Sequence, residues 1–148
     1  MTHDHILVDI DSVLSNAAHR EPLITELGWD AFHAAGIDDA PVMPIRNLIE
    51  AHRSIGYTVL LLTARPEKWR QQTLKWLALH EINIDGLLMR ADNDFRPAPI
   101  VKVDLALEYF GCEPKLKDRV ALVIDDREDI LKEFANMGIV TLQVTVPK

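Results

Sequence analysis

Two aspartates, Asp9 and Asp11, follow an apolar run near the N-terminus, and their spacing suggests chemistry. On an extended backbone, side chains two positions apart point the same way, so both carboxylates face one space. Such a pair can hold a cation or place a nucleophile beside an acid. The alternative is that aspartate here only forms a turn or caps a helix. Polar groups later in the chain help to decide between the two.

Each later apolar run is also followed by residues that suit a metal ion or a phosphate. In chain order these groups are Thr63-Ala64-Arg65, Lys102 and Asp125-Asp126. We expect Lys102 in the first turn of a helix, where the helix dipole disfavours a cation by roughly 0.5 kcal/mol, so an anion should lie beside it. Carboxylates suit Mg²⁺, which prefers oxygen ligands, while a lysine and a hydroxyl offset charge on phosphoryl oxygens.

The apolar runs and the patterns between them predict the elements that position these groups. Strands are expected at 6–8, 57–62, 84–89, 120–124 and 139–146, with helices at 22–27, 29–35, 41–56, 66–81, 99–110 and 127–138. This alternation predicts a three-layer, Rossmann-like α/β fold with a parallel five-stranded sheet and helices on both faces. We expect a single domain over residues 1–148 and no large cap domain. In such sheets ligands bind beyond the carboxyl ends of the strands, where all the polar groups fall.

Charge and composition limit the classes of function. The net charge of -7 argues against non-specific coating of nucleic acid, so a polyanionic substrate needs a local basic patch. Candidates for that patch are Arg20, Arg65, Arg90 and Arg96. A single cysteine, no signal-like segment and no apolar run long enough for a bilayer predict a cytoplasmic protein without membrane attachment. No GxxxxGK or GxGxxG motif is present, which excludes a P-loop kinase and leaves dinucleotide binding unsupported.

Taken in order, the four polar groups resemble the motifs of the haloacid dehalogenase (HAD) superfamily of phosphotransferases. Asp9-Ile10-Asp11-Ser12-Val13 resembles its DxDx(T/V) motif, with Ser12 where glycine is commoner and Val13 an accepted variant of threonine. The stretch 62–65 resembles the hydroxyl motif, Lys102 the lysine motif and 124–126 the acidic motif. The resemblance spans residues 6–138 and implies a HAD-like fold.

The resemblance also implies roles for single residues. Asp9 would attack phosphorus to form an aspartyl-phosphate, and Asp11 would protonate the leaving oxygen and later activate water. Mg²⁺ would be held by Asp9, the Asp11 backbone carbonyl and Asp125, with Asp126 as a ligand or an orienting group. Thr63 and Lys102 complete the catalytic set. The substrate-binding set is Ser12, Ala64, Arg65, Arg20 and Arg96.

A finer resemblance is to the 3′-phosphatase domain of phage-type polynucleotide kinase. The residues that carry it are His19-Arg20, Trp29 with Phe32, 63–65, 76–77, 88–90, 94–97 before Val101-Lys102, and 124–127. Ala98 departs from the pattern, which often has aspartate there. This resemblance implies a Mg²⁺-dependent enzyme that removes 3′-phosphates from nucleic-acid ends, and a site without a large lid leaves room for a polymer end.

Two other functions stay open at this point. One is a phosphatase for small substrates such as nucleoside monophosphates; the other is a non-catalytic, receiver-like or phosphate-binding module. A homo-oligomer and a separate kinase or ligase chain are open as partners. Trp29 and Phe32 stand three apart, a helical spacing that favours core packing over a platform for base stacking.

Overall fold

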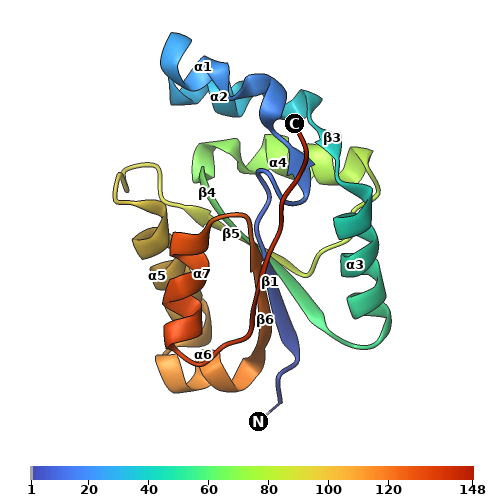
Figure 1. The fold of residues 1–148 in the computed structure, drawn as a ribbon, viewed down its shortest axis with the longest axis vertical. Helices are drawn as coiled ribbons and strands as arrows, with labels where there is room; N and C mark the ends of the chain where they lie inside the picture. Colours follow the sequence, from blue (N-terminus) through green and yellow to red (C-terminus); the bar gives the residue numbers. More distant parts are fainter. Residues whose placement is uncertain (1) are drawn as a thin grey trace.

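Five parallel strands form the central sheet, in the spatial order β5-β4-β1-β6-β7 (Figure 1). A computed structural model describes residues 2–148. The strands are β1 (His5–Val8), β4 (Thr58–Pro66), β5 (Gly86–Arg90), β6 (Val120–Asp125) and β7 (Thr141–Gln143). The predicted parallel five-stranded α/β fold is therefore confirmed. Because β1 is central and pairs with both β4 and β6, its carboxyl end opens between the ends of those two strands.

Helices cover both faces of the sheet, as alternating side chains along the strands require. Ile6 and Val8 face α3 (Met43–Ser54) and α4 (Arg70–Leu79) in one core. Leu7 belongs to a second core on the other face, which is covered by α5 (Ala98–Phe110), α6 (Glu113–Arg119) and α7 (Glu128–Asn136). In Figure 1, α3 lies on the right of the sheet and α5, α6 and α7 lie on the left.

Residues 15–41, which we call the cap segment, lie beyond the carboxyl ends of the strands, at the top of Figure 1. The segment contains β2 (Ser15–Asn16), η1 (Ala18–Arg20), α1 (Pro22–Glu26), α2 (Trp29–Ala34), η2 (Ala35–Asp38) and β3 (Ala40–Pro41), and β2 pairs with β3 in antiparallel fashion. The cap segment is therefore small and built of short elements.

Trp29 is exposed and Phe32 is buried, so the expectation of core packing is confirmed for Phe32 and wrong for Trp29.

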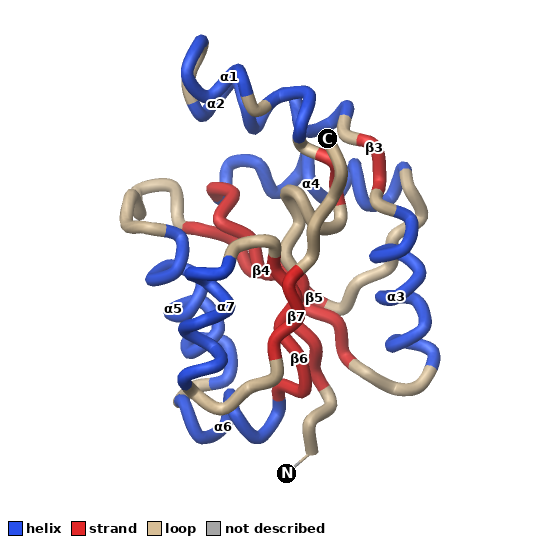
Figure 2. The backbone as a smooth tube through the Cα atoms, in the orientation of Figure 1, coloured by secondary structure: helices blue, strands red, loops and turns tan. Residues whose placement is uncertain are grey.

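Several predicted boundaries were wrong. β4 runs on to Pro66, because it keeps pairing with β5 as far as Arg90, and a short 3₁₀ helix, η3 (Glu67–Trp69), precedes α4. β7 is much shorter than the expected strand 139–146, since the chain leaves the sheet and approaches the cap segment, where the Asn16 amide donates to the Pro147 carbonyl (Figure 2).

Short elements account for the remaining differences. The sequence pattern missed β2, β3 and α6, which are too short to show a clear period. α5 begins at Ala98, so Lys102 lies in its second turn and not in the first. Within the part of the chain that the structure describes, no helix has both the length and the apolar character to cross a membrane.

Candidate active site

Lys102 lies between two carboxylates at the carboxyl end of the sheet. Its Nζ donates to Asp9 Oδ1 at 2.8 Å and to Asp125 Oδ2 at 2.6 Å, and the side chain is buried. Asp9 directly follows β1, and Asp125 is the last residue of β6. Lys102 belongs to α5, a helix that covers one face of the sheet. The expected anion beside Lys102 is therefore present, and it is a pair of carboxylates.

Asp9, Asp125 and Asp126 each offer a carboxylate oxygen, and these oxygens all lie within 4.8 Å of one another. Three carboxylates against the single ammonium of Lys102 leave an excess of negative charge in a largely buried place. An all-oxygen set with this charge fits a divalent cation such as Mg²⁺. The Asp11 carboxylate is not a member of this group, and a metal contact by its backbone carbonyl stays a prediction.

Burial and charge shift the pKa values of these acids. Burial raises the pKa of Asp9 well above its usual range, with Lys102 opposing this shift and Asp125 and Asp11 adding to it. Burial, together with a hydrogen bond to Asp125 and that group's charge, raises the pKa of Asp126 to about 6. The same two carboxylates, Asp9 and Asp125, raise the pKa of Lys102 despite its burial. The lysine is therefore a permanent cation in the site.

Asp11 is bound by two arginines. Arg65 donates to it through Nε at 3.0 and 3.2 Å and through Nη2 at 2.7 Å, and Arg20 donates through Nη2. Burial alone raises the pKa of Asp11, but the two guanidinium groups outweigh it and hold the pKa well below its usual range. Asp11 is therefore a carboxylate in this structure, which is the form required to accept a proton from water.

Arg20 was expected in a local basic patch that binds substrate, and its burial contradicts that placement. Its side chain is fully buried, and its nitrogens donate to Asp39, Asp11 and the Phe32 carbonyl. Burial is possible because carboxylates on two sides balance the charge. Arg65 is also buried, and it reaches Asp11 and Thr73, so it lies beside the site and not on the surface.

Thr63 is fully buried within β4, three residues before the strand ends, and its Oγ1 accepts a hydrogen bond from the Arg65 backbone N–H at 3.1 Å. The hydroxyl proton stays free to be donated to another group. Ser12 has a φ of 64°, in the left-handed region that favours glycine. That backbone conformation explains why glycine is the commoner residue at the corresponding place in the motif.

The remaining expected groups lie at the end of β5, in the loop that follows it and in β4. Arg90 donates to the carbonyls of Ala64, Asp94 and Arg96. The Arg96 side chain is half exposed and forms ion pairs with Asp94 and Asp104. The carbonyl of Ala64 and both arginines are thus engaged with protein groups. Substrate contacts by Ser12, Ala64, Arg65 and Arg96 remain predictions.

Two residues near the site were not expected from the sequence. Asp39, at the end of the cap segment, binds Arg20, and Thr73, in α4, accepts from Arg65. Neither follows a strand, so the spacing of motifs gave no signal for them.

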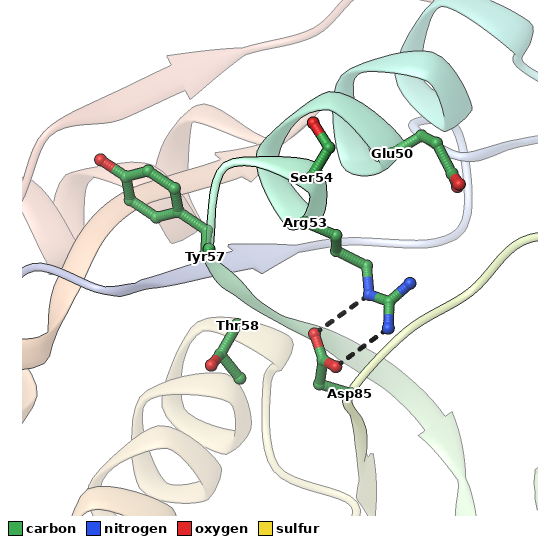
Figure 3. A pocket seen from close by; sticks show the side chains of 7 residues that line it. Glu50, Arg53, Ser54, Tyr57, Thr58 and Asp85 are labelled. Carbon is green, nitrogen blue, oxygen red and sulfur yellow. Dashed lines mark hydrogen bonds and ion pairs between the residues drawn. The ribbon is translucent and has the colours of Figure 1, made fainter.

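An open surface hollow lies at the amino end of β4, next to Tyr57. The Arg53–Asp85 ion pair, with a distance of 3.2 Å, lies in the lining of this hollow (Figure 3). It is at the opposite end of the sheet from Asp9.

Comparison with solved structures shows the same fold in several phosphatases. A predicted phosphatase from Clostridium acetobutylicum superposes with a TM-score of 0.70 at 13% identity, covering 97% of this chain and 85% of that one. A HAD family enzyme from Bacteroides thetaiotaomicron, solved with magnesium and inorganic phosphate, gives a TM-score of 0.59 at 17% identity, covering 98% and 96%. These similarities support the HAD-like fold.

A more similar structure is a chain in the Pnkp1/Rnl/Hen1 complex, with a TM-score of 0.82 and 26% identity. The superposition covers 99% of this chain and 47% of that chain, so this chain spans about half its length. Among curated proteins, none matches this chain significantly. The family model described as "Polynucleotide kinase PNKP phosphatase domain" matches residues 3–148. With that match over nearly its whole length and a HAD-like fold, the chain belongs to the PNKP phosphatase-domain family of HAD-like phosphatases.

Proposed function

We propose that this protein is a Mg²⁺-dependent phosphatase that removes 3′-phosphates from nucleic-acid ends through an aspartyl-phosphate on Asp9. The observation that carries the chemistry is the group of buried Asp9, Lys102 and Asp125 with half-buried Asp126 at the carboxyl end of the sheet. A carboxylate beside a fixed cation and a set of oxygen ligands is suited to attack on a phosphoryl group. Membership of the PNKP phosphatase-domain family supports the choice of substrate.

In the first step an Asp9 carboxylate oxygen forms a bond to phosphorus while the bond from phosphorus to the leaving oxygen breaks. Lys102 keeps Asp9 oriented and offsets negative charge on the phosphoryl oxygens. The free hydroxyl proton of Thr63 is available to one of those oxygens. Mg²⁺ held by Asp9, Asp125 and Asp126 would supply further positive charge and lower the pKa of Asp9.

Asp11 moves the protons in both steps. It gives a proton to the leaving oxygen, and afterwards it takes one from the water that hydrolyses the aspartyl-phosphate. In the free protein Arg65 and Arg20 hold it as a carboxylate. A bound phosphate group competes for the Arg65 guanidinium, which raises the pKa of Asp11 and allows it to carry the proton that the first step needs.

The proposed substrate is a polymer end, and the proposed partners are enzymes on other chains. A similar structure is part of a Pnkp1/Rnl/Hen1 RNA repair complex, which supports work beside other end-processing enzymes. The small size of the cap segment supports a polymer end over an enclosed small substrate, because no large lid has to close over the site.

The test compares a 3′-phosphorylated oligonucleotide with free nucleoside monophosphates, each with Mg²⁺ and with EDTA. The proposal expects a higher kcat/KM for the oligonucleotide, and loss of activity with EDTA or in Asp9→Asn. A higher kcat/KM for mononucleotides would instead assign a small-molecule phosphatase. Absence of phosphate release from every substrate, including an aryl phosphate, would reject an enzyme and favour a phosphate-binding module.

A further inference from the structure

Asp39 is a fully buried carboxylate that holds Arg20 through two hydrogen bonds. Arg20 Nε donates to Asp39 Oδ1 at 2.9 Å, and Arg20 Nη2 donates to Asp39 Oδ2 at 2.7 Å. Both side chains are completely shielded from solvent. A two-point pair of this kind fixes the plane of the guanidinium as well as its position.

The same Arg20 Nη2 also donates to Asp11 Oδ1, so one nitrogen joins the two carboxylates. Other contacts keep the guanidinium in place. The Phe32 ring lies 4.1 Å from its Cζ atom, and the Phe32 carbonyl accepts from Nη1 at 3.1 Å. Gly36 lies beside it, at a distance where an added Cβ would be in van der Waals contact with Cζ at 3.4 Å. Arg20 therefore has little freedom to move while Asp39 holds it.

Asp39 is itself anchored by two residues from separate parts of the chain. The buried Trp76 Nε1 donates to the Asp39 backbone carbonyl at 2.9 Å. The His19 ring, which is 48% exposed, places Nε2 at 2.8 Å from Asp39 Oδ1. A connected path thus runs from α4 and the cap segment through Asp39 and Arg20 to Asp11.

The two oxygens of Asp11 receive different numbers of hydrogen bonds. Oδ1 accepts from Arg20 Nη2 and from Arg65 Nη2 and Nε, whereas Oδ2 accepts from Arg65 Nε alone. The less engaged oxygen, Oδ2, is the one better able to exchange a proton. Two carboxylates and two guanidinium groups are balanced in charge. Without the Asp39 charge, Asp11 would be the only carboxylate paired with the two guanidinium groups. The plane of the Arg20 guanidinium would then no longer be fixed by the two hydrogen bonds to Asp39.

We propose that Asp39 is a positioning residue which, by holding Arg20 against Oδ1 of Asp11, keeps Oδ2 directed for proton transfer. This inference rests on the proposed role of Asp11 as acid and base. It does not depend on whether the substrate is a polymer or a small molecule.

The test measures how kcat/KM depends on the leaving group. p-Nitrophenyl phosphate releases a good leaving group that needs little protonation, whereas phenyl phosphate releases a poor one that needs an acid. Asp39→Asn should reduce kcat/KM for phenyl phosphate by roughly 10- to 100-fold, since misplacement by about 1 Å can lower a rate 100-fold. For p-nitrophenyl phosphate the loss should stay below roughly 3-fold, because general acid catalysis contributes little there.

Asp30→Asn is the matched control. Asp30 lies in the same cap segment and is exposed, and its carboxylate pairs with the Lys68 ammonium at 2.7 Å. It should leave both kcat/KM values unchanged. Far-UV circular dichroism shows whether Asp39→Asn folds. If it does not, His19→Ala takes its place, because this substitution removes one hydrogen-bond partner of Asp39 and, since His19 is half exposed, leaves no buried charge without a partner. His19→Ala should show the same selectivity at roughly 3- to 10-fold.

Equal losses for the two substrates, or no loss, in the folded variant would overturn the inference. Asp11→Asn serves as the reference and should show the strongest dependence on the leaving group. If Asp11→Asn shows no such dependence, the proposed role of Asp11 is wrong and the inference is rejected with it. If Asp11→Asn shows it and the Asp39 and His19 variants do not, only the positioning role is rejected.

Discussion

Replacement of Lys102 by methionine tests whether this lysine and a divalent cation neutralise the same carboxylates. Lys102 is 2% exposed and pairs with Asp9 at 2.8 Å and with Asp125 at 2.6 Å. Removal of one member of a buried ion pair destabilises a protein by about 3–5 kcal/mol, because the remaining charge is buried without a partner. Asp9, whose pKa is already raised, limits the loss by taking up a proton. We therefore expect the free energy of unfolding to fall by about 3 kcal/mol in EDTA.

Mg²⁺ should restore part of this loss. A ligand at 100 times its Kd stabilises the folded state by about 2.7 kcal/mol, and the variant should bind Mg²⁺ more tightly because no ammonium competes for the same oxygens. The assay is urea unfolding followed by tryptophan fluorescence over a series of Mg²⁺ concentrations. Phosphatase activity should fall by about 100-fold even with Mg²⁺, since the lysine no longer offsets charge on the phosphoryl oxygens.

Lys132→Met is the matched control, because Lys132 is exposed on α7. It should change neither stability nor activity. A loss below about 1 kcal/mol for Lys102→Met in EDTA would show that the lysine is not a buried counter-ion. A loss that Mg²⁺ leaves unchanged would show that the metal does not share its carboxylates.

Three further results are expected. Asp11→Asn should keep Mg²⁺ binding, measured by calorimetry, while turnover falls by about 100-fold or more, because its carboxylate lies outside the cation cluster; lost metal affinity would contradict this division of roles. Burial lowers the pKa of His33 to about 4, so the unfolded chain binds its proton first as the pH falls, and the contribution of His33 to stability should drop by up to about 3 kcal/mol between pH 6.5 and 4. The raised pKa values of Asp9 and Asp126 change stability in the opposite sense in both proteins, so urea unfolding at several pH values should show this loss as a difference between the wild type and His33→Gln. Trp76→Phe should cost about 2 kcal/mol in the same assay, since it leaves the Asp39 carbonyl without its donor and opens a gap in the core; an unchanged midpoint would argue against that bond.

The cluster around Asp9 could be predicted from the sequence for a simple reason. Parallel strands joined by helices all end at one edge of the sheet, so residues that directly follow them must come close together. The positions of Asp9 and Asp125 could be predicted once the strands that precede them were assigned correctly. Lys102 was placed in the first turn of its helix and lies in the second, yet the anion that was expected from the helix dipole is present as Asp9 and Asp125.

The surroundings of Asp11 could not be predicted in the same way. Arg20 and Asp39 belong to short elements in the cap segment, where no regular period links sequence position to burial. An arginine in such a segment is normally exposed, and Arg20 was interpreted accordingly. Only the contacts with Asp39, Phe32 and Asp11 show that it is interior.

The sequence by itself thus determined the order of the five sheet strands and of the helices other than α6, the parallel sheet, and the acids and lysine at its carboxyl edge, because local periodicity and strand ends are properties of the chain. The tertiary structure decided the spatial order β5-β4-β1-β6-β7, the path of the last residues toward the cap segment, and the pairing of Asp11 with Arg65 and Arg20. Those features depend on which distant segments pack together. A buried charge finds its partner through that packing and not through spacing along the chain.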